Sequence, residues 1–98
     1  MPGIDIHQAE ARRTSAQVLD VRENFETAGG MIPGAVHIPL GELGARLAEL
    51  DRTRPVIVVC RSGNRSARAA DALNGAGFTA ETMAGGMTAW QQAGRPTR

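Results

Sequence analysis

The apolar run Pro-Val-Ile-Val-Val at residues 55–59 constrains the fold of this chain more than any other feature. An apolar run without polar alternation is typical of a strand that is covered on both faces of its sheet. A polar loop follows at once, and residues 66–74 then have a helical pattern. A buried strand that passes through a short loop into a helix predicts an α/β fold with a mainly parallel sheet.

Shorter strand and helix patterns alternate along the rest of the chain. Apolar stretches bounded by turn residues predict strands at residues 17–21, 36–38 and 79–83, and Ile4 is expected to open a short edge strand. Helices are expected at residues 7–13, 41–50, 66–74 and 87–92, with a short helical turn at residues 24–27. Ligand sites of parallel sheets lie beyond the carboxyl ends of the strands. Cys60, the segment from Asp20 to Arg22 and the pair Gly85–Gly86 are expected at such ends, so three loops can converge on one site.

Local signals predict where these helices begin and which face they bury. Asp5 and Gln8 have the spacing of a capping box. Asn24 and Ser66 are side chains that favour the first position of a helix, and we expect each to act as a cap. Leucines at positions 40, 43, 47 and 50 predict the buried stripe of a helix at residues 41–50.

Composition narrows the class of protein. The 98 residues are expected to form one domain, over residues 1–98. A net charge of +1 and three aromatic residues favour neither nucleic acid nor a membrane as partner. A single cysteine allows no internal disulfide and no thiolate-based zinc site, and it fits a reducing compartment, for which we expect the cytoplasm. Neither a signal segment nor a membrane span is expected.

Cys60 is the candidate for chemistry because of where it stands. It lies at the end of the strand at residues 55–59, and Arg61 and Arg65 flank the loop that follows. Backbone N–H groups at the start of a helix and nearby arginines both lower the pKa of a thiol and favour the reactive thiolate. A lone cysteine is often a small buried hydrophobe, but the polar loop and the arginines favour a nucleophile here.

The number of residues between Cys60 and Arg65 indicates the size of the group that the loop can hold. Cys60 and Arg65 form the pattern Cys-x4-Arg, and Gly63 between them permits a backbone conformation that turns successive N–H groups inward as an anion nest. Cysteine phosphatases hold a tetrahedral phosphate with one residue more, Cys-x5-Arg. The shorter loop favours a smaller guest, such as a single sulfur atom bonded to Cys60 as a persulfide.

Four segments in order make the chain resemble the single-domain rhodaneses, a family of sulfurtransferases. They are VLDVRE at residues 18–23, IPGAVHIPL at 32–40, VVCRSGNRSARAADAL at 58–73 and GFTAETMAGGMTAW at 77–90. Two positions depart from the common pattern of the family. Met31 replaces a histidine that is often found before Ile-Pro-Gly, and Val59 replaces a frequent aromatic residue. Neither is expected to touch the nucleophile, so we expect them to affect packing or access.

The resemblance implies a three-layer α/β fold with a central parallel sheet of about five strands between helices. It implies that Cys60 is the catalytic residue, which takes sulfane sulfur from a small anionic donor such as thiosulfate and passes it to a thiol or cyanide; a sulfur-accepting protein is a further candidate acceptor. The amides that would cradle the persulfide belong to Arg61, Ser62, Gly63, Asn64 and Arg65. No metal or organic cofactor is expected.

The supporting residues and two rival functions stay open on sequence alone. Arg65 can clamp the loop through a carboxylate, bind the donor directly, or do both, and Arg61 can attract an anionic donor. Asp20 and Arg22, with Ser66, are expected to support the loop, since Asp20 and Arg22 can pair with each other, with Glu26 or with loop groups. The rival functions are a cysteine phosphatase or arsenate reductase-like enzyme, and a non-catalytic module that carries sulfur or recruits a partner.

Overall fold

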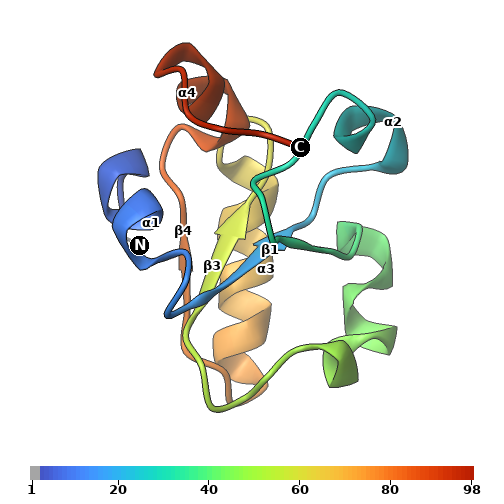
Figure 1. The fold of residues 1–98 in the computed structure, drawn as a ribbon. Helices are drawn as coiled ribbons and strands as arrows, with labels where there is room; N and C mark the ends of the chain where they lie inside the picture. Colours follow the sequence, from blue (N-terminus) through green and yellow to red (C-terminus); the bar gives the residue numbers. More distant parts are fainter. Residues whose placement is uncertain (1–2) are drawn as a thin grey trace.

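A computed structural model of the chain describes residues 3–98. Strands and helices alternate along it (Figure 1). In chain order the elements are α1 (Ile6–Arg12), β1 (Gln17–Asp20), α2 (Asn24–Thr27), β2 (Val36–His37), the 3-10 helices η1 (Leu40–Ala45) and η2 (Leu47–Glu49), β3 (Val56–Val59), α3 (Asn64–Gly75), β4 (Ala80–Thr82) and α4 (Gly86–Gln92). Within residues 3–98, no helix has the length and apolar character needed to cross a membrane.

The strands form one parallel sheet with the order β2-β1-β3-β4. This confirms the predicted α/β class and its parallel sheet, but the sheet has four strands rather than about five. Ile4, which we expected to open an edge strand, forms one isolated bridge to Met83. A single bridge extends the sheet beside β4 without adding a strand, because the chain passes into α1 two residues later.

Residues of β3 point alternately into two hydrophobic clusters, one on each face of the sheet. Val56 and Val58 pack with Leu73 of α3 on one face, and Ile57 and Val59 pack with Trp90 of α4 on the other. All four β3 residues are buried. The apolar run is therefore continuous for the reason that the sequence predicts. Helices cover both faces of the sheet, so the fold has three layers.

The prediction of a single helix at residues 41–50 has the wrong helix type. The segment folds as η1 and η2, two 3-10 helices that meet at Arg46. Its leucines do share one face, since Leu43 and Leu50 are buried in the cluster that also receives Leu40 and Leu47. Leu40 and Leu43 of η1, like Leu47 of η2 and Leu50 directly after it, are three residues apart, which matches the three-residue turn of a 3-10 helix. The stripe thus predicts the buried face correctly and the helix type incorrectly.

Two of the three expected helix caps are also wrong. Asp5 and Gln8 do form the predicted capping box of α1. The cap of α2, however, is Glu23 rather than Asn24, and its backbone N–H donates to the Glu26 side chain. Ser66 lies inside α3, whose cap is Gly63. The Ser66 hydroxyl instead lies within hydrogen-bond distance of the Gly63 carbonyl, at 3.0 Å, and faces the sulfur of Cys60.

Candidate active site

The carboxyl end of β3 places Cys60 at the bottom of a tight loop. Cys60 follows directly after Val59 and is 1% exposed. Three residues later, Gly63 has a φ of +115° in the left-handed region, which residues with a Cβ rarely adopt. This turn reverses the chain and starts α3 at Asn64. The loop therefore folds back over the cysteine, as the Cys-x4-Arg spacing predicts.

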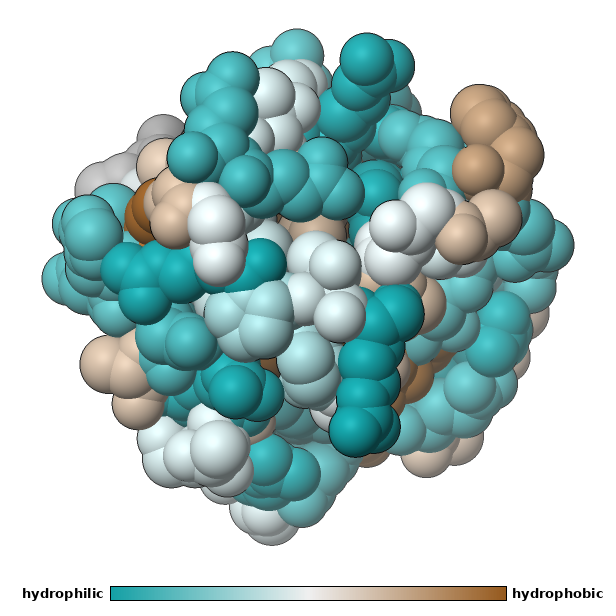
Figure 2. Space-filling model, turned by 45° about the horizontal axis from the view of Figure 1, so that its top comes forward, coloured by the Kyte–Doolittle hydropathy of each residue, from teal (hydrophilic) through white to brown (hydrophobic). Residues whose placement is uncertain are grey.

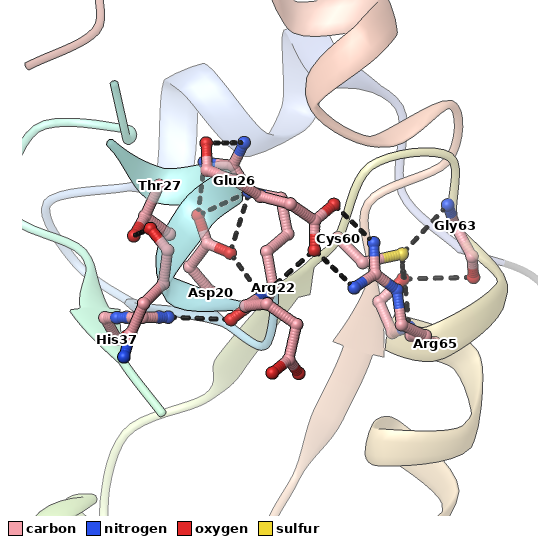
Figure 3. A network of polar contacts seen from close by, with 11 residues as sticks. Asp20, Arg22, Glu26, Thr27, His37, Cys60, Gly63 and Arg65 are labelled. Carbon is pink, nitrogen blue, oxygen red and sulfur yellow. Dashed lines mark hydrogen bonds and ion pairs between the residues drawn. The ribbon is translucent and has the colours of Figure 1, made fainter. Parts of the chain in front are cut away.

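Three hydrogen bonds surround the Cys60 sulfur (Figure 3). The Gly63 and Ser66 amides donate to Sγ at 3.0 Å and 3.4 Å, and the Ser66 hydroxyl oxygen lies 3.5 Å away. Burial by itself raises the pKa of the Cys60 thiol, but the Ser66 hydroxyl and the amides of Ser66, Gly63 and Ser62 outweigh it. The pKa of Cys60 consequently lies below its ordinary value, which favours the thiolate.

The first turn of α4 binds two backbone carbonyl groups at the start of the loop. The Met87 amide donates to the Cys60 carbonyl at 2.8 Å, and the Thr88 amide donates to the Arg61 carbonyl at 3.0 Å. Gly86 makes this approach possible: a Cβ there would lie 2.5 Å from both carbonyl oxygens. The predicted convergence of the loops after β3 and β4 is thus confirmed, and the approach of their backbones requires glycine.

Arg65 forms a bidentate ion pair with Glu26 of α2. Its NH1 and NH2 groups donate to the two carboxylate oxygens at 2.6 Å and 2.7 Å. The hydrogen bonds from Arg65 lower the pKa of Glu26 to about 2. The structure therefore supports the reading of Arg65 as a clamp on the loop. The sequence predicts Glu26 only as a partner of Asp20 and Arg22, because no local pattern links it to a residue that lies 39 positions away.

Asp20 and Arg22 form a buried pair that anchors α2. Arg22 donates to both Asp20 oxygens, at 3.0 Å and 2.9 Å, and also to the backbone carbonyls of Glu26 and Gly30. Asp20 is fully buried and Arg22 is 5% exposed. Asp20 and Arg22 thus pair with each other, one of the partnerships expected from the sequence, and their support of the Cys60 loop stays a prediction. They fix α2, and α2 presents Glu26 to Arg65 (Figure 3).

A threonine that no sequence pattern indicates completes the surroundings of the sulfur. Thr82, the last residue of β4, contacts the Ser66 hydroxyl with its own hydroxyl oxygen. Both side chains are buried. Thr82 ends the strand next to β3, so strand order would have pointed to it if the pairing of β3 with β4 had been known.

Three of the remaining loop residues lie at the surface. Arg61, Ser62 and Asn64 are exposed. Arg61 forms one wall of a cleft of about 680 Å³, together with Met87 and Thr88 of α4. Arg22, Phe25 and Glu26 form the opposite side. Whether the amides of Arg61, Ser62, Asn64 and Arg65 cradle a persulfide, as the resemblance implies, stays a prediction.

The fold and the site together define a class of protein: an α/β domain that holds one cysteine beyond a central parallel strand, in a loop whose backbone amides donate to its sulfur. The model of the Rhodanese-like domain matches residues 5–93. The chain belongs to the rhodanese-like family.

Proteins similar to this chain include named sulfurtransferases. It is 36% identical over 80 residues to "Sulfurtransferase" of Allochromatium vinosum, covering 81% of this chain and 75% of that protein. It is 36% identical over 86 residues to "Thiosulfate sulfurtransferase GlpE" of Pseudomonas savastanoi, covering 86% and 81%. The crystal structure of a rhodanese-related protein from Thermoplasma volcanium matches with a TM-score of 0.94 at 33% identity, covering 100% of this chain and 98% of that one. These comparisons support a function of the sulfurtransferase type.

Proposed function

We propose that this chain transfers sulfane sulfur from a donor such as thiosulfate to a thiophilic acceptor through a persulfide on Cys60. The observation that carries the proposal is the set of hydrogen bonds on the Cys60 sulfur, which favour its thiolate inside a loop of four intervening residues. The same donors would stabilise negative charge as it forms on sulfur during transfer.

The first half-reaction loads the enzyme. The Cys60 thiolate attacks the outer sulfur of thiosulfate, and a new S–S bond forms as the bond to the sulfonate sulfur breaks. The electron pair of the broken bond leaves with sulfite, and Cys60 is left as a persulfide anion. Arg61, exposed at the loop tip, would attract the anionic donor.

The second half-reaction transfers the sulfur from the enzyme to an acceptor. An acceptor attacks the outer sulfur of the persulfide, the S–S bond breaks, and its electron pair returns to Cys60 as the thiolate. With cyanide the product is thiocyanate. This is covalent catalysis by double displacement, and it predicts ping-pong kinetics.

Intact-mass analysis tests the proposal directly. After incubation with thiosulfate, we expect the protein to gain the mass of one sulfur atom and to lose it again when cyanide is added. The matched variant Cys60→Ser should show no gain, because it lacks the nucleophile. Failure of the wild-type protein to gain sulfur from any sulfane donor would overturn the proposal. Turnover of an aryl phosphate without sulfur transfer would favour the phosphatase alternative instead.

A further inference from the structure

Residues 95–98, which we call the strap, cross the surface from α4 to the segment that follows α2 (Figure 1). Beside α4, the indole N–H of Trp90 donates to the Pro96 carbonyl at 2.8 Å. At the other end, the backbones of Met31 and Arg98 exchange two hydrogen bonds. The Met31 amide donates to the Arg98 carbonyl at 2.8 Å, and the Arg98 amide donates to the Met31 carbonyl at 2.7 Å. The strap therefore ties α4 to the segment after α2.

Hydrogen bonds rather than apolar packing hold the strap in place. Arg95 at its start is half-buried and donates to the ring of His7 in α1, whereas Pro96, Thr97 and Arg98 are exposed. Figure 2 brings the end of the molecule with α4 toward the reader and shows that it is largely hydrophilic. Segments with few buried contacts and exposed backbone hydrogen bonds open at a low cost in free energy. The strap can therefore detach while the core stays folded.

The position of α2 depends on polar contacts. Its four residues are all exposed or half-buried, so they contribute little to the core. Arg22 donates to the Glu26 carbonyl at 3.3 Å and to the Gly30 carbonyl at 2.8 Å. The Glu26 carboxylate in turn binds Arg65 at the start of α3. The helix α2 therefore lies where Arg22 and Arg65 hold it.

The strap is fastened next to one of these contacts. Met31, which binds Arg98, directly follows Gly30, and the Gly30 carbonyl accepts from Arg22. Gly30 also lies against the strap: its φ is +124°, and a Cβ there would be 3.1 Å from both Cβ and Oγ1 of Thr97. The strap thus fixes the stretch of backbone to which Arg22 donates.

We infer that the strap positions Cys60 for reaction by holding α2 against the loop through the Glu26–Arg65 pair. This inference goes beyond the proposed function and rests on it only in taking Cys60 as the nucleophile. When the strap detaches, the Gly30 segment is free to move, and Arg22 no longer holds α2 in one place. Arg65 then loses a fixed partner, and the amides that donate to the Cys60 sulfur hold it less tightly. The thiolate is stabilised less, so Cys60 reacts more slowly at neutral pH.

A matched pair of substitutions tests the strap at one backbone N–H. Arg98→Pro lacks the N–H that donates to Met31, whereas Arg98→Ala retains it and loses the same charged side chain. We expect the rate constant for alkylation of Cys60 by iodoacetamide at neutral pH to fall about two- to fivefold in Arg98→Pro, which corresponds to the loss of one neutral hydrogen bond. The midpoint of the alkylation rate against pH should move upward. Arg98→Ala should match the wild type in both measurements.

The same substitution in a Glu26→Gln background tests the route by which the strap acts. Because the strap is coupled to Cys60 through Glu26, Arg98→Pro should slow alkylation in the wild-type background and leave it unchanged in Glu26→Gln. Equal effects in the two backgrounds, equal slowing in Arg98→Ala, or an unchanged rate in Arg98→Pro would each overturn the inference. Intact-mass analysis with thiosulfate on the same proteins separates the two claims. If alkylation follows the expected pattern but thiosulfate never loads Cys60, the inference stands and the proposed function fails.

Discussion

The reactivity of Cys60 depends on which neighbour receives the hydroxyl proton of Ser66 in a hydrogen bond. The Ser66 hydroxyl lies within reach of the Cys60 sulfur, the Gly63 carbonyl and the Thr82 hydroxyl, but it can donate to one of them at a time. A Cys60 thiolate has no proton to donate, and it accepts at least as many hydrogen bonds as the thiol does. Ser66 then stabilises the charge best if it donates to sulfur while Thr82 donates to Ser66.

We therefore expect Thr82→Val to raise the pKa of Cys60. Valine keeps the shape of threonine, but it removes the donor that polarises the Ser66 hydroxyl. A neutral hydrogen bond is worth about 1 kcal/mol, so the rate of alkylation by iodoacetamide at neutral pH should fall about fivefold or less. The measurement is that rate as a function of pH. Thr82→Ser retains a hydroxyl and should restore the wild-type profile, and an unchanged profile in Thr82→Val would show that Thr82 only fills space.

At the scale of elements, the site depends on how closely α4 approaches the loop after β3. Gly86 has a φ of +58° and stands against the carbonyls of Cys60 and Arg61. These neighbours are backbone atoms, which cannot move without displacing the loop or α4. The position therefore has no room for a side chain.

Gly86→Ala is expected to reduce the free energy of unfolding by about 2 kcal/mol or more and to slow sulfur loading. The added Cβ would force α4 away from the loop and would weaken the hydrogen bonds from Met87 and Thr88. Urea unfolding and intact-mass analysis measure the two effects. Gly75→Ala is the matched control: this glycine is the last residue of α3 and has open space around it, so alanine there should not lower the free energy of unfolding. Equal stability of the two variants would contradict the close-approach argument.

Elements whose signal is local could be predicted from the sequence. The continuous run of β3 and the capping box of α1 depend on neighbouring residues, and both were predicted correctly. The segment after β2 was not, because leucines at this spacing fit an α-helix and two 3-10 helices equally well. The cap of α3 is a glycine chosen for its backbone conformation rather than for a capping side chain, so the preference of serine for caps pointed to the wrong residue.

At the scale of the whole molecule, a parallel sheet brings together loops that the sequence keeps apart. The convergence of the loops after β1, β3 and β4 could be predicted from the rule that sites lie at strand ends. The partners within that site could not. Glu26 and Arg65 meet across two elements, and Thr82 meets Ser66 only because β4 lies beside β3. Such pairs depend on strand order and on distances between loops, which no local pattern encodes.

The Glu26–Arg65 pair ties the loop after β1 to the start of α3, and it makes the stability of the molecule depend on pH. The pKa of Glu26 is held at about 2 in the folded chain, against an ordinary value of 4.5. The folded state thus binds fewer protons at this site than the unfolded state does. The contribution of Glu26 to stability is therefore fully present above about pH 4.5, declines as the pH falls further, and is lost below about pH 2.

Glu26→Gln removes this charge and should remove its pH dependence. We expect the variant to be less stable than the wild type by about 1 kcal/mol at pH 6, since the pair is partly exposed to solvent. The difference should shrink steadily between pH 5 and pH 2, because the wild type loses the charge there and the variant has none to lose. Urea unfolding of both proteins across that range measures it. Asp71→Asn, at an exposed position of α3 outside every ion pair of residues 3–98, should show no comparable difference. A gap between wild type and Glu26→Gln that stayed constant down to pH 2 would mean that packing, rather than charge, holds α2 against the loop.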